Sequence, residues 1–182
     1  MKTSYKKESY VEKELVETVI KLLQNQEMDE ISIRDLCHEA GVERASFYRH
    51  YQNKEEILER HATSLMKQWE KEFESNPNSR PWNVFESLFT HIKNHQSFYK
   101  ILYKTNRDMV LRTSLRQKIG LATELTNEEA YQKVFFADGI CGWIEEWIER
   151  DMKESPKELN QLLQHYFTDI LSHLGELYIK KT

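Results

Sequence analysis

The chain has 182 residues, enough for one well-filled core or for a small domain joined to a larger one. Only 5 glycines and 3 prolines interrupt long stretches of Leu, Glu, Lys, Gln and Ile, which favours helices over short strands. No stretch approaches the roughly 18 apolar residues that a membrane span needs, so we expect a cytoplasmic protein without a membrane partner. The composition predicts an all-α fold with about nine helices.

The net charge of −4 does not by itself indicate a nucleic-acid-binding protein, because phosphates prefer a basic surface. The positive charge is concentrated, however, and the segment from Arg44 to Lys54 has basic residues and no acidic ones. The 2 cysteines, Cys37 and Cys141, lie far apart, which favours neither a disulfide framework nor a zinc cluster. We interpret both as small core residues and expect no cofactor.

The N-terminal third contains three predicted helices. Apolar residues at three- and four-residue steps predict an amphipathic helix from about Glu8 to Asn25. Ser32 then precedes a short apolar-faced helix as its N-cap, and Gly41 ends that helix. A third helix from about Arg44 to His50 follows the glycine turn.

The helix from Arg44 to His50 is predicted to have two different sides. Phe47 and Tyr51 are four residues apart and should pack inward. The opposite side combines small, aromatic and basic residues, which are Arg44, Ala45, Tyr48 and Arg49. Two short helices joined by a glycine turn, the second with such an outer side, favour a helix-turn-helix. The pattern alone also fits an ordinary corner between helices.

The remaining chain is predicted to be helical as well. Asn53 and Glu56 form a capping signal for a helix that runs to about Phe73, and the segment 76–81 forms a loop. Further helices are predicted over residues 82–92, 98–103, 109–122, 126–152 and 156–179. The last two should form an antiparallel pair, because the turn between them is short.

The segment from Ile31 to Leu58 contains a set of residues in a recognisable order, namely Ser32, Ala40, Gly41, Val42, Phe47, Tyr48, His50, Tyr51, Lys54, Glu55 and Glu56. These residues match, or substitute conservatively in, the pattern of the DNA-binding region of the TetR family of bacterial transcription regulators, which the segment therefore resembles. The chain departs from the family pattern where Ala45 replaces a frequent Gly and Glu43 a small polar residue, and residues 26–29 lack the usual Gly. The segment 136–144 with Trp147 is similar to a C-terminal domain of Firmicutes members that resemble the activator of the dihydroxyacetone kinase operon.

The resemblance implies a sequence-specific regulator, with repression as the expected effect, built from a DNA-binding domain in residues 1–53 and an effector-binding and dimerisation domain in residues 54–182. Arg44 and Arg49 are the candidates for base contacts, because arginine bonds guanine with two hydrogen bonds. Ala45 shares their side of the helix. The candidates for phosphate contacts are Ser32, Ser46, Tyr48, His50 and Lys54.

Operator selectivity by one short helix requires a symmetric homodimer. Family members pair their last two helices across the dimer axis, which makes the apolar residues of these helices candidates for the interface: Trp143, Trp147, Leu163, Tyr166, Phe167, Ile170 and Leu174. The alternative is that these residues belong to the internal core of one chain.

The aromatic residues of the central region lie where family members enclose an effector: Trp82, Phe85, Phe89, Phe98, Tyr99, Tyr103, Phe135 and Phe136. Such a lining would suit an apolar or aromatic molecule, although an aromatic stripe at helical spacing also describes a filled core. His91 and His95 are four residues apart, but no third ligand completes a metal site in the sequence. No phosphate loop, nucleophile elbow or metallohydrolase motif is present, so we expect no enzyme. A protein-binding role remains the third alternative.

Overall fold

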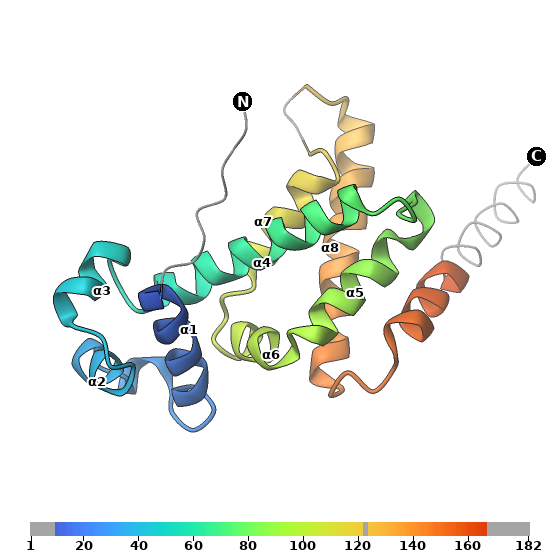
Figure 1. Ribbon diagram of the computed structural model, residues 1–182. Coiled ribbons are helices and arrows are strands. Elements are labelled where there is room, and N and C mark those ends of the chain that lie inside the picture. The colour runs from blue at the N-terminus through green and yellow to red at the C-terminus, as the bar shows by residue number, and fades with distance from the viewer. Residues whose placement is uncertain (1–9, 122–123, 167–182) are drawn as a thin grey trace, which may run out of the picture. The chain divides into compact units, whose positions relative to one another are not determined.

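The computed structural model describes residues 10–121 and 124–166, and this part is helical without any strand. Its elements are α1 (Tyr10–Leu22), η1 (Met28–Glu30), α2 (Ile33–Glu39), α3 (Arg44–His50), α4 (Glu55–Ser75), η2 (Pro81–Asn83), α5 (Val84–Asn94), α6 (Gln96–Lys104), α7 (Met109–Lys118) and α8 (Asn127–Glu149). A further helix covers residues 156–166 (Figure 1). The predicted all-α fold is confirmed.

The chain divides into two compact units, which we describe separately. The first contains the residues up to Gln68 together with Ser97–Cys141, and the second contains Trp69–Gln96 together with the residues from Gly142 on. Both α4 and α8 therefore contribute their longer N-terminal part to the first unit and their C-terminal part to the second. None of the helices in the described residues is long and apolar enough to cross a membrane.

In the first unit, α1, α2 and α3 contact one another pairwise (Figure 1). Each contributes its apolar stripe to a shared core, in which Leu15 of α1, Leu36 of α2 and Phe47 of α3 are completely buried. None of these helices exceeds four turns, so their stability must come from this packing and not from helix propensity. Truncating any of the three side chains to Ala would cost about 2–5 kcal/mol.

The rest of the first unit is built on the N-terminal part of α4, on α6 and α7, and on the N-terminal part of α8. His61 of α4 meets the ring of Phe98 of α6 edge-on, with centroids 4.7 Å apart. Arg116 of α7 donates from Nε to Asp138 of α8 at 2.9 Å, and Arg112 lies 3.2 Å from the same carboxylate. The hydrogen bond from Arg116 lowers the pKa of Asp138 below its usual range. These bonds fasten α7 to α8.

The second unit centres on Trp147 of α8, which is buried and meets Phe89 of α5 at a centroid distance of 5.8 Å. Its indole Nε1 donates to the carbonyl of Glu154 at 3.2 Å, and Lys93 donates to the carbonyl of Met152 at 2.6 Å. Both bonds hold the turn after α8. Asp151 and Met152 have φ angles of 64° and 52° in that turn.

These two left-handed residues correct the prediction that the α8 helix reaches Met152, because left-handed backbone cannot continue a right-handed helix. Three other boundaries also differ, whereas the helix predicted from Arg44 to His50 has those bounds. The first helix ends at Leu22 instead of Asn25, and the 109–122 helix ends at Lys118, just before Gly120 with its φ of 77°. The predicted helix at 82–92 starts at Val84, and Trp82 precedes it in the 3-10 turn, 67% exposed. Both cysteines are buried, as predicted.

Candidate nucleic-acid interface

Ser32 caps the first helix of the predicted helix-turn-helix. Its Oγ accepts a hydrogen bond from the backbone N–H of Asp35 at 3.1 Å and donates to the Asp35 carboxylate at 2.6 Å. The bond from Ser32 lowers the pKa of Asp35. The sequence predicted this cap correctly, and the same hydroxyl is thereby engaged within its own helix.

Gly41 forms the turn between α2 and α3. Its φ of 62° is left-handed, and its N–H donates to the carbonyl of His38 at 3.2 Å. The next residue, Val42, donates to the carbonyl of Cys37 at 2.9 Å. This pair of bonds is the Schellman arrangement, which satisfies the last carbonyls of a helix and favours glycine at the left-handed position. The turn fixes the direction in which α3 leaves α2.

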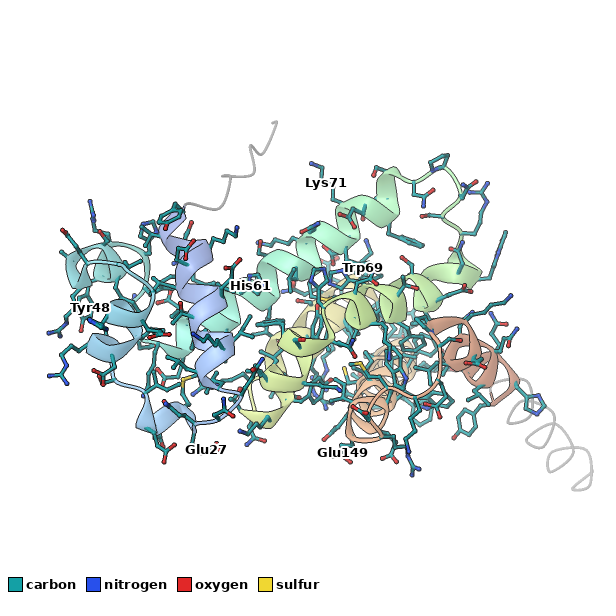
Figure 2. The ribbon with its side chains drawn as sticks, turned by 60° about the horizontal axis from the view of Figure 1, so that its bottom comes forward. Glu27, Tyr48, His61, Trp69, Lys71 and Glu149 are labelled. Atoms are coloured by element: carbon teal, nitrogen blue, oxygen red, sulfur yellow. The ribbon has the colours of Figure 1, made fainter. Side chains whose placement is uncertain are left out.

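The two sides of α3 differ as the sequence predicted. Phe47 is completely buried and Tyr51, just after the helix, is nearly so, whereas Arg44, Ala45 and Tyr48 are exposed. Tyr48 is 52% exposed, and Figure 2 labels its position on α3. The outer side thus offers a guanidinium, a methyl group and a phenol. These are groups that hydrogen-bond or contact bases and phosphates in a major groove.

Arg49 and Ser46 lie on α3 as a bonded pair. Arg49 is exposed, and its Nη2 donates to Ser46 Oγ at 2.6 Å. Glu43 occupies the N-cap position of α3, but its side chain makes no capping hydrogen bond. A carboxylate at this position repels phosphate. It can still accept a hydrogen bond from the amino group of cytosine.

Two of the residues predicted to hold phosphates contact other segments of the same unit. The Lys54 ammonium donates to the carbonyls of Met28 and Ile31, the second at 2.7 Å. His50 is half-buried, and its Nδ1 lies 3.4 Å from a carboxylate oxygen of Glu12 on α1. Lys54 therefore ties the start of α4 to the segment that leads into α2.

Arg60 on α4 is a positioning residue that the sequence pattern did not reveal. Its guanidinium donates to the carbonyl of His50 at the end of α3 and lies 5.0 Å from the centroid of the Tyr51 ring. It also lies 3.8 Å from Glu12 and, one helical turn away, from Glu56. The only sequence signal was the Glu56–Arg60 spacing, which predicts a local ion pair and not a bond across ten residues.

Two family comparisons cover most of the chain. Residues 15–60 match the model described as bacterial regulatory proteins of the tetR family, and residues 80–169 match one described as a transcriptional regulator C-terminal region. This chain belongs to the TetR family. It is therefore a DNA-binding transcription regulator and not an enzyme, and its helix-turn-helix lies within the first matched segment. No curated protein matches the sequence.

Solved structures of three proteins share the fold of this TetR-family chain. Lin0861 from Listeria innocua has a TM-score of 0.73 at 19% identity, covering 88% of this chain and 91% of its own. The fatty acid degradation regulator FadR from Bacillus halodurans has a TM-score of 0.61 at 15% identity, with coverages of 87% and 96%. The dihydroxyacetone kinase operon activator DhaS has a TM-score of 0.51 at 18% identity, with coverages of 89% and 96%. The likeness of segment 136–147 to the DhaS-like subgroup stays a prediction.

The eight aromatic residues predicted to line an effector site are divided between the two units. Phe98, Tyr99, Tyr103, Phe135 and Phe136 belong to the first unit, and Trp82, Phe85 and Phe89 to the second. Phe89, Phe98 and Tyr99 are buried, Phe85, Tyr103 and Phe136 are half-buried, and Trp82 and Phe135 are mainly exposed. An effector site among them stays a prediction.

The candidate dimer residues also differ in exposure. Trp147 and Leu163 are buried within one chain, Trp143 is half-buried, and Tyr166 is 47% exposed, with its ring 6.0 Å from that of Trp143. Phe167, Ile170 and Leu174 lie outside the described residues. Within the described part of the chain, no group of three His, Cys, Asp or Glu residues is arranged to hold a metal ion.

Proposed function

We propose that this regulator is a repressor that binds a two-fold symmetric operator as a homodimer and releases it when a small molecule binds in residues 54–182. Residues 1–53 form the DNA-binding domain in this proposal. The observation that carries it is the outer side of α3, where Arg44, Ala45 and Tyr48 are exposed while Phe47 is completely buried. A helix with this composition, held by a glycine turn, fits the major groove.

The proposed contacts follow from the positions of the side chains. Arg44 and Arg49 would contact base edges, with Arg49 exchanging its bond to Ser46 for one to DNA. Tyr48, Ser46 and the N-terminus of α2 at Ser32 would face phosphates. Lys54 and His50 would contribute through the electrostatic field and through the positions of α2 and α3.

Dimerisation is required because one α3 helix contacts too few base pairs for an operator. Two copies would place their α3 helices about 34 Å apart, one turn of DNA. Leu162 and Tyr166 keep about half of their surface exposed in the single chain and Trp143 is half-buried beside them, which makes this the surface we propose for the partner copy. The buried Trp147 and Leu163 would support it from beneath.

Ligand control would use the contacts between α6 and the DNA-binding helices. At the end of α6, Lys104 lies 3.1 Å from Glu27, next to η1, and Arg107, in the segment after α6, donates to Glu59 of α4 at 3.0 Å. A ligand that favours one position of α6 would favour one spacing of the two α3 helices, and so one DNA affinity.

The test is selection of binding sites from random duplex DNA with the purified protein at fixed salt near the physiological value. We expect a palindrome with half-sites one helical turn apart. A promoter with this site, placed before a reporter gene, should be expressed more strongly when the regulator is removed, because a bound dimer occupies the promoter. An unenriched DNA pool would contradict operator binding, and lower expression on removal would show an activator.

A further inference from the structure

The segment from Ile31 to Lys54 contains the helix-turn-helix and has three acidic residues, two of which have partners inside the protein. Asp35 accepts a hydrogen bond at 2.6 Å from the hydroxyl group that caps α2. Glu39 lies 2.8 Å from a lysine ammonium of α1. The third acidic residue is Glu43, directly before α3. Asp35 and Glu39 are thus engaged among the DNA-binding helices, whereas Glu43 stands at the start of the outward helix.

The Glu43 side chain is exposed, and its carboxylate makes no hydrogen bond or ion pair with any described residue. Its backbone is nevertheless fixed, because its carbonyl oxygen accepts from the N–H groups of Ser46 at 2.8 Å and Phe47 at 3.1 Å. The φ and ψ angles of −68° and 139° are those of an ordinary N-cap residue. The backbone therefore holds the base of this side chain in place, and the carboxylate stays available to a ligand.

Arg44 follows Glu43 in the chain and is equally available. Its side chain is exposed, and no hydrogen bond or ion pair joins it to the described part of the chain. Neighbouring residues of a helix do not face each other, which explains why the carboxylate and the guanidinium do not pair. The surface proposed to enter the major groove therefore begins with one unpaired carboxylate and one unpaired guanidinium.

An unpaired carboxylate on a DNA-binding surface weakens binding to most sequences. It repels the phosphates of any DNA, and its loss of water at the interface is unfavourable unless a hydrogen-bond donor replaces the water. In the major groove guanine presents two acceptors, thymine an acceptor and a methyl group, and adenine an amino group beside an acceptor. Cytosine presents an amino donor without an acceptor next to it. The carboxylate thus disfavours three bases and is satisfied by one, which is how an unpaired charge creates specificity.

The first residues of a recognition helix are the ones that reach base edges in the major groove. Glu43 and Arg44 occupy these positions, and Tyr48 lies one turn further along α3. We propose that Glu43 is a specificity-determining residue that accepts a hydrogen bond from the amino group of a cytosine in each operator half-site. The inference rests on the proposed operator binding and adds the identity of one base to it.

Selection of binding sites from random duplex DNA with the wild type and with Glu43→Gln tests which base is read. Glutamine keeps the shape of the side chain without its charge, and its amide bonds adenine with two hydrogen bonds. We expect a cytosine at one position of each half-site for the wild type. Glu43→Gln should select adenine at that position and the same bases elsewhere. Identical palindromes from both proteins would overturn the inference.

Fluorescence anisotropy at fixed salt measures the size of the effect on operators in which thymine replaces that cytosine in one half-site. The wild type should lose affinity about tenfold. Glu43→Ala should lose less than about twofold from the same replacement, because it has no carboxylate to discriminate between the bases. It should also bind random DNA more tightly than the wild type, since one group that repels phosphates is gone. An equal loss for both proteins would assign the cytosine to another residue and overturn the inference.

Two further variants separate base recognition from stability and from net charge. Glu43→Ser places a preferred N-cap residue before α3, so its urea midpoint should be no lower than that of the wild type, and the cytosine preference should still be lost. Asp29→Asn removes the same charge from η1, at an exposed position outside the helix-turn-helix, and should keep the preference. A preference that persists in Glu43→Ser, or that is lost in Asp29→Asn as well, would overturn the contact.

The same selections distinguish a failure of this inference from a failure of the proposed function. If the wild type selects a palindrome and no Glu43 variant alters it, the cytosine contact is refuted and operator binding stays intact. If the wild type selects no palindrome, the proposed operator binding is refuted, and the cytosine contact is refuted with it.

Discussion

Lys54 is the basic residue for which two roles, binding a DNA phosphate and stabilising the fold, can be separated by experiment. Its ammonium donates to two backbone carbonyls, of Met28 and Ile31, and the side chain is half-buried. Lys54→Met keeps the aliphatic stem and removes the charge. Hydrogen bonds from a charged donor contribute about 1.5–3 kcal/mol each, and two that share one ammonium should together contribute about 2–3 kcal/mol. For a chain of this size that corresponds to a melting temperature roughly 4–12 °C lower.

Lys21→Met is the matched control, because it removes the same charge from the same domain. Lys21 lies 2.8 Å from Glu39, but both side chains are largely exposed. Such surface pairs contribute about 0–1 kcal/mol. Circular dichroism at 222 nm follows thermal and urea unfolding of both variants at one protein concentration, since the stability of a dimer depends on concentration.

The two roles of Lys54 predict different results. If Lys54 binds the carbonyls, Lys54→Met unfolds at a clearly lower temperature than Lys21→Met and the wild type. If Lys54 binds a phosphate, as the sequence suggested, Lys54→Met melts at the same temperature as the control. It then binds every DNA sequence more weakly, and the slope of log affinity against log salt concentration becomes smaller by about one unit. Equal melting of the two variants together with that smaller slope would refute the structural role.

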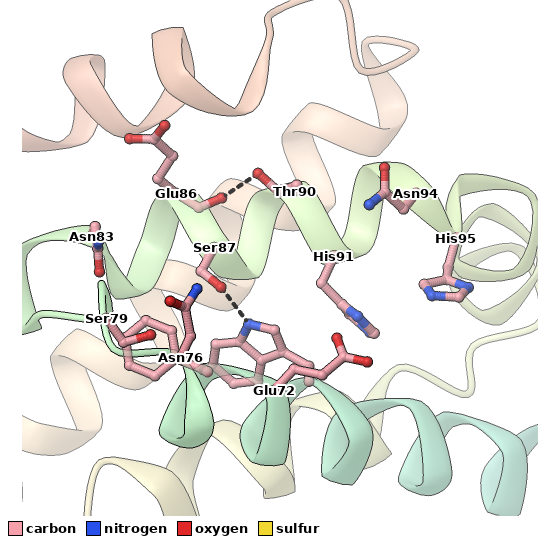
Figure 3. Close-up of a pocket in the computed structure, with 12 residues that line it drawn as sticks. Glu72, Asn76, Ser79, Asn83, Glu86, Ser87, Thr90, His91, Asn94 and His95 are labelled. Carbon is pink, nitrogen blue, oxygen red and sulfur yellow. Dashed lines mark hydrogen bonds between the residues drawn. The ribbon is translucent and has the colours of Figure 1, made fainter.

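Three further predictions concern the operator surface, the glycine turn and the cavity that His91 lines between α4 and α5 (Figure 3). Arg44→Ala should lose about 1–3 kcal/mol of binding free energy on the selected operator and relax specificity at one base pair. An equal loss of binding free energy on random DNA, measured in the same gel-shift series, would contradict a contact to a base. Gly41→Ala should destabilise by about 1–2 kcal/mol through its left-handed φ alone, because a Cβ there meets nothing within 4 Å. Gly139→Ala, at an equally open position inside α8, should leave the free energy of unfolding unchanged or raise it by up to about 1 kcal/mol. If urea unfolding shows that both alanine variants change stability in the same direction, the argument from the φ of Gly41 is refuted. His91 has a lowered pKa in the folded state, so the unfolded chain binds its proton first and stability is lost as the pH falls from about 6.5 toward about 4. His91→Gln should make the melting temperature depend less on pH over this range. If the variant keeps the pH dependence of the wild type, His91 does not cause it.

The local features of the DNA-binding region could be predicted from the sequence because each depends on neighbouring residues. The Ser32 cap requires a hydroxyl three residues before a free N–H, and the Gly41 turn requires a residue without a Cβ. The two sides of α3 follow from a spacing of four residues, which placed Phe47 inside and Tyr48 outside. Motifs of this kind are complete within about ten residues.

The ends of several helices could not be predicted in this way. Asp151 and Met152 adopt left-handed backbone without any glycine, in a turn that is bonded to Trp147 of α8 itself and to the distant Lys93 of α5. Trp82 carried an apolar pattern and is nevertheless exposed. A periodic pattern indicates which residues can be buried, and only the neighbouring helices determine which of them are covered.

The sequence alone determined the family, the helical fold and the outward side of α3, because these depend on contiguous residues. Only the tertiary structure decided that Lys54 and Arg60 bind backbone carbonyls 10 to 26 residues away. It also decided that a cavity lined mainly by polar residues lies between α4 and α5. Such contacts join residues that are distant in the chain, and their partners are chosen by the packing of whole helices and not by local spacing.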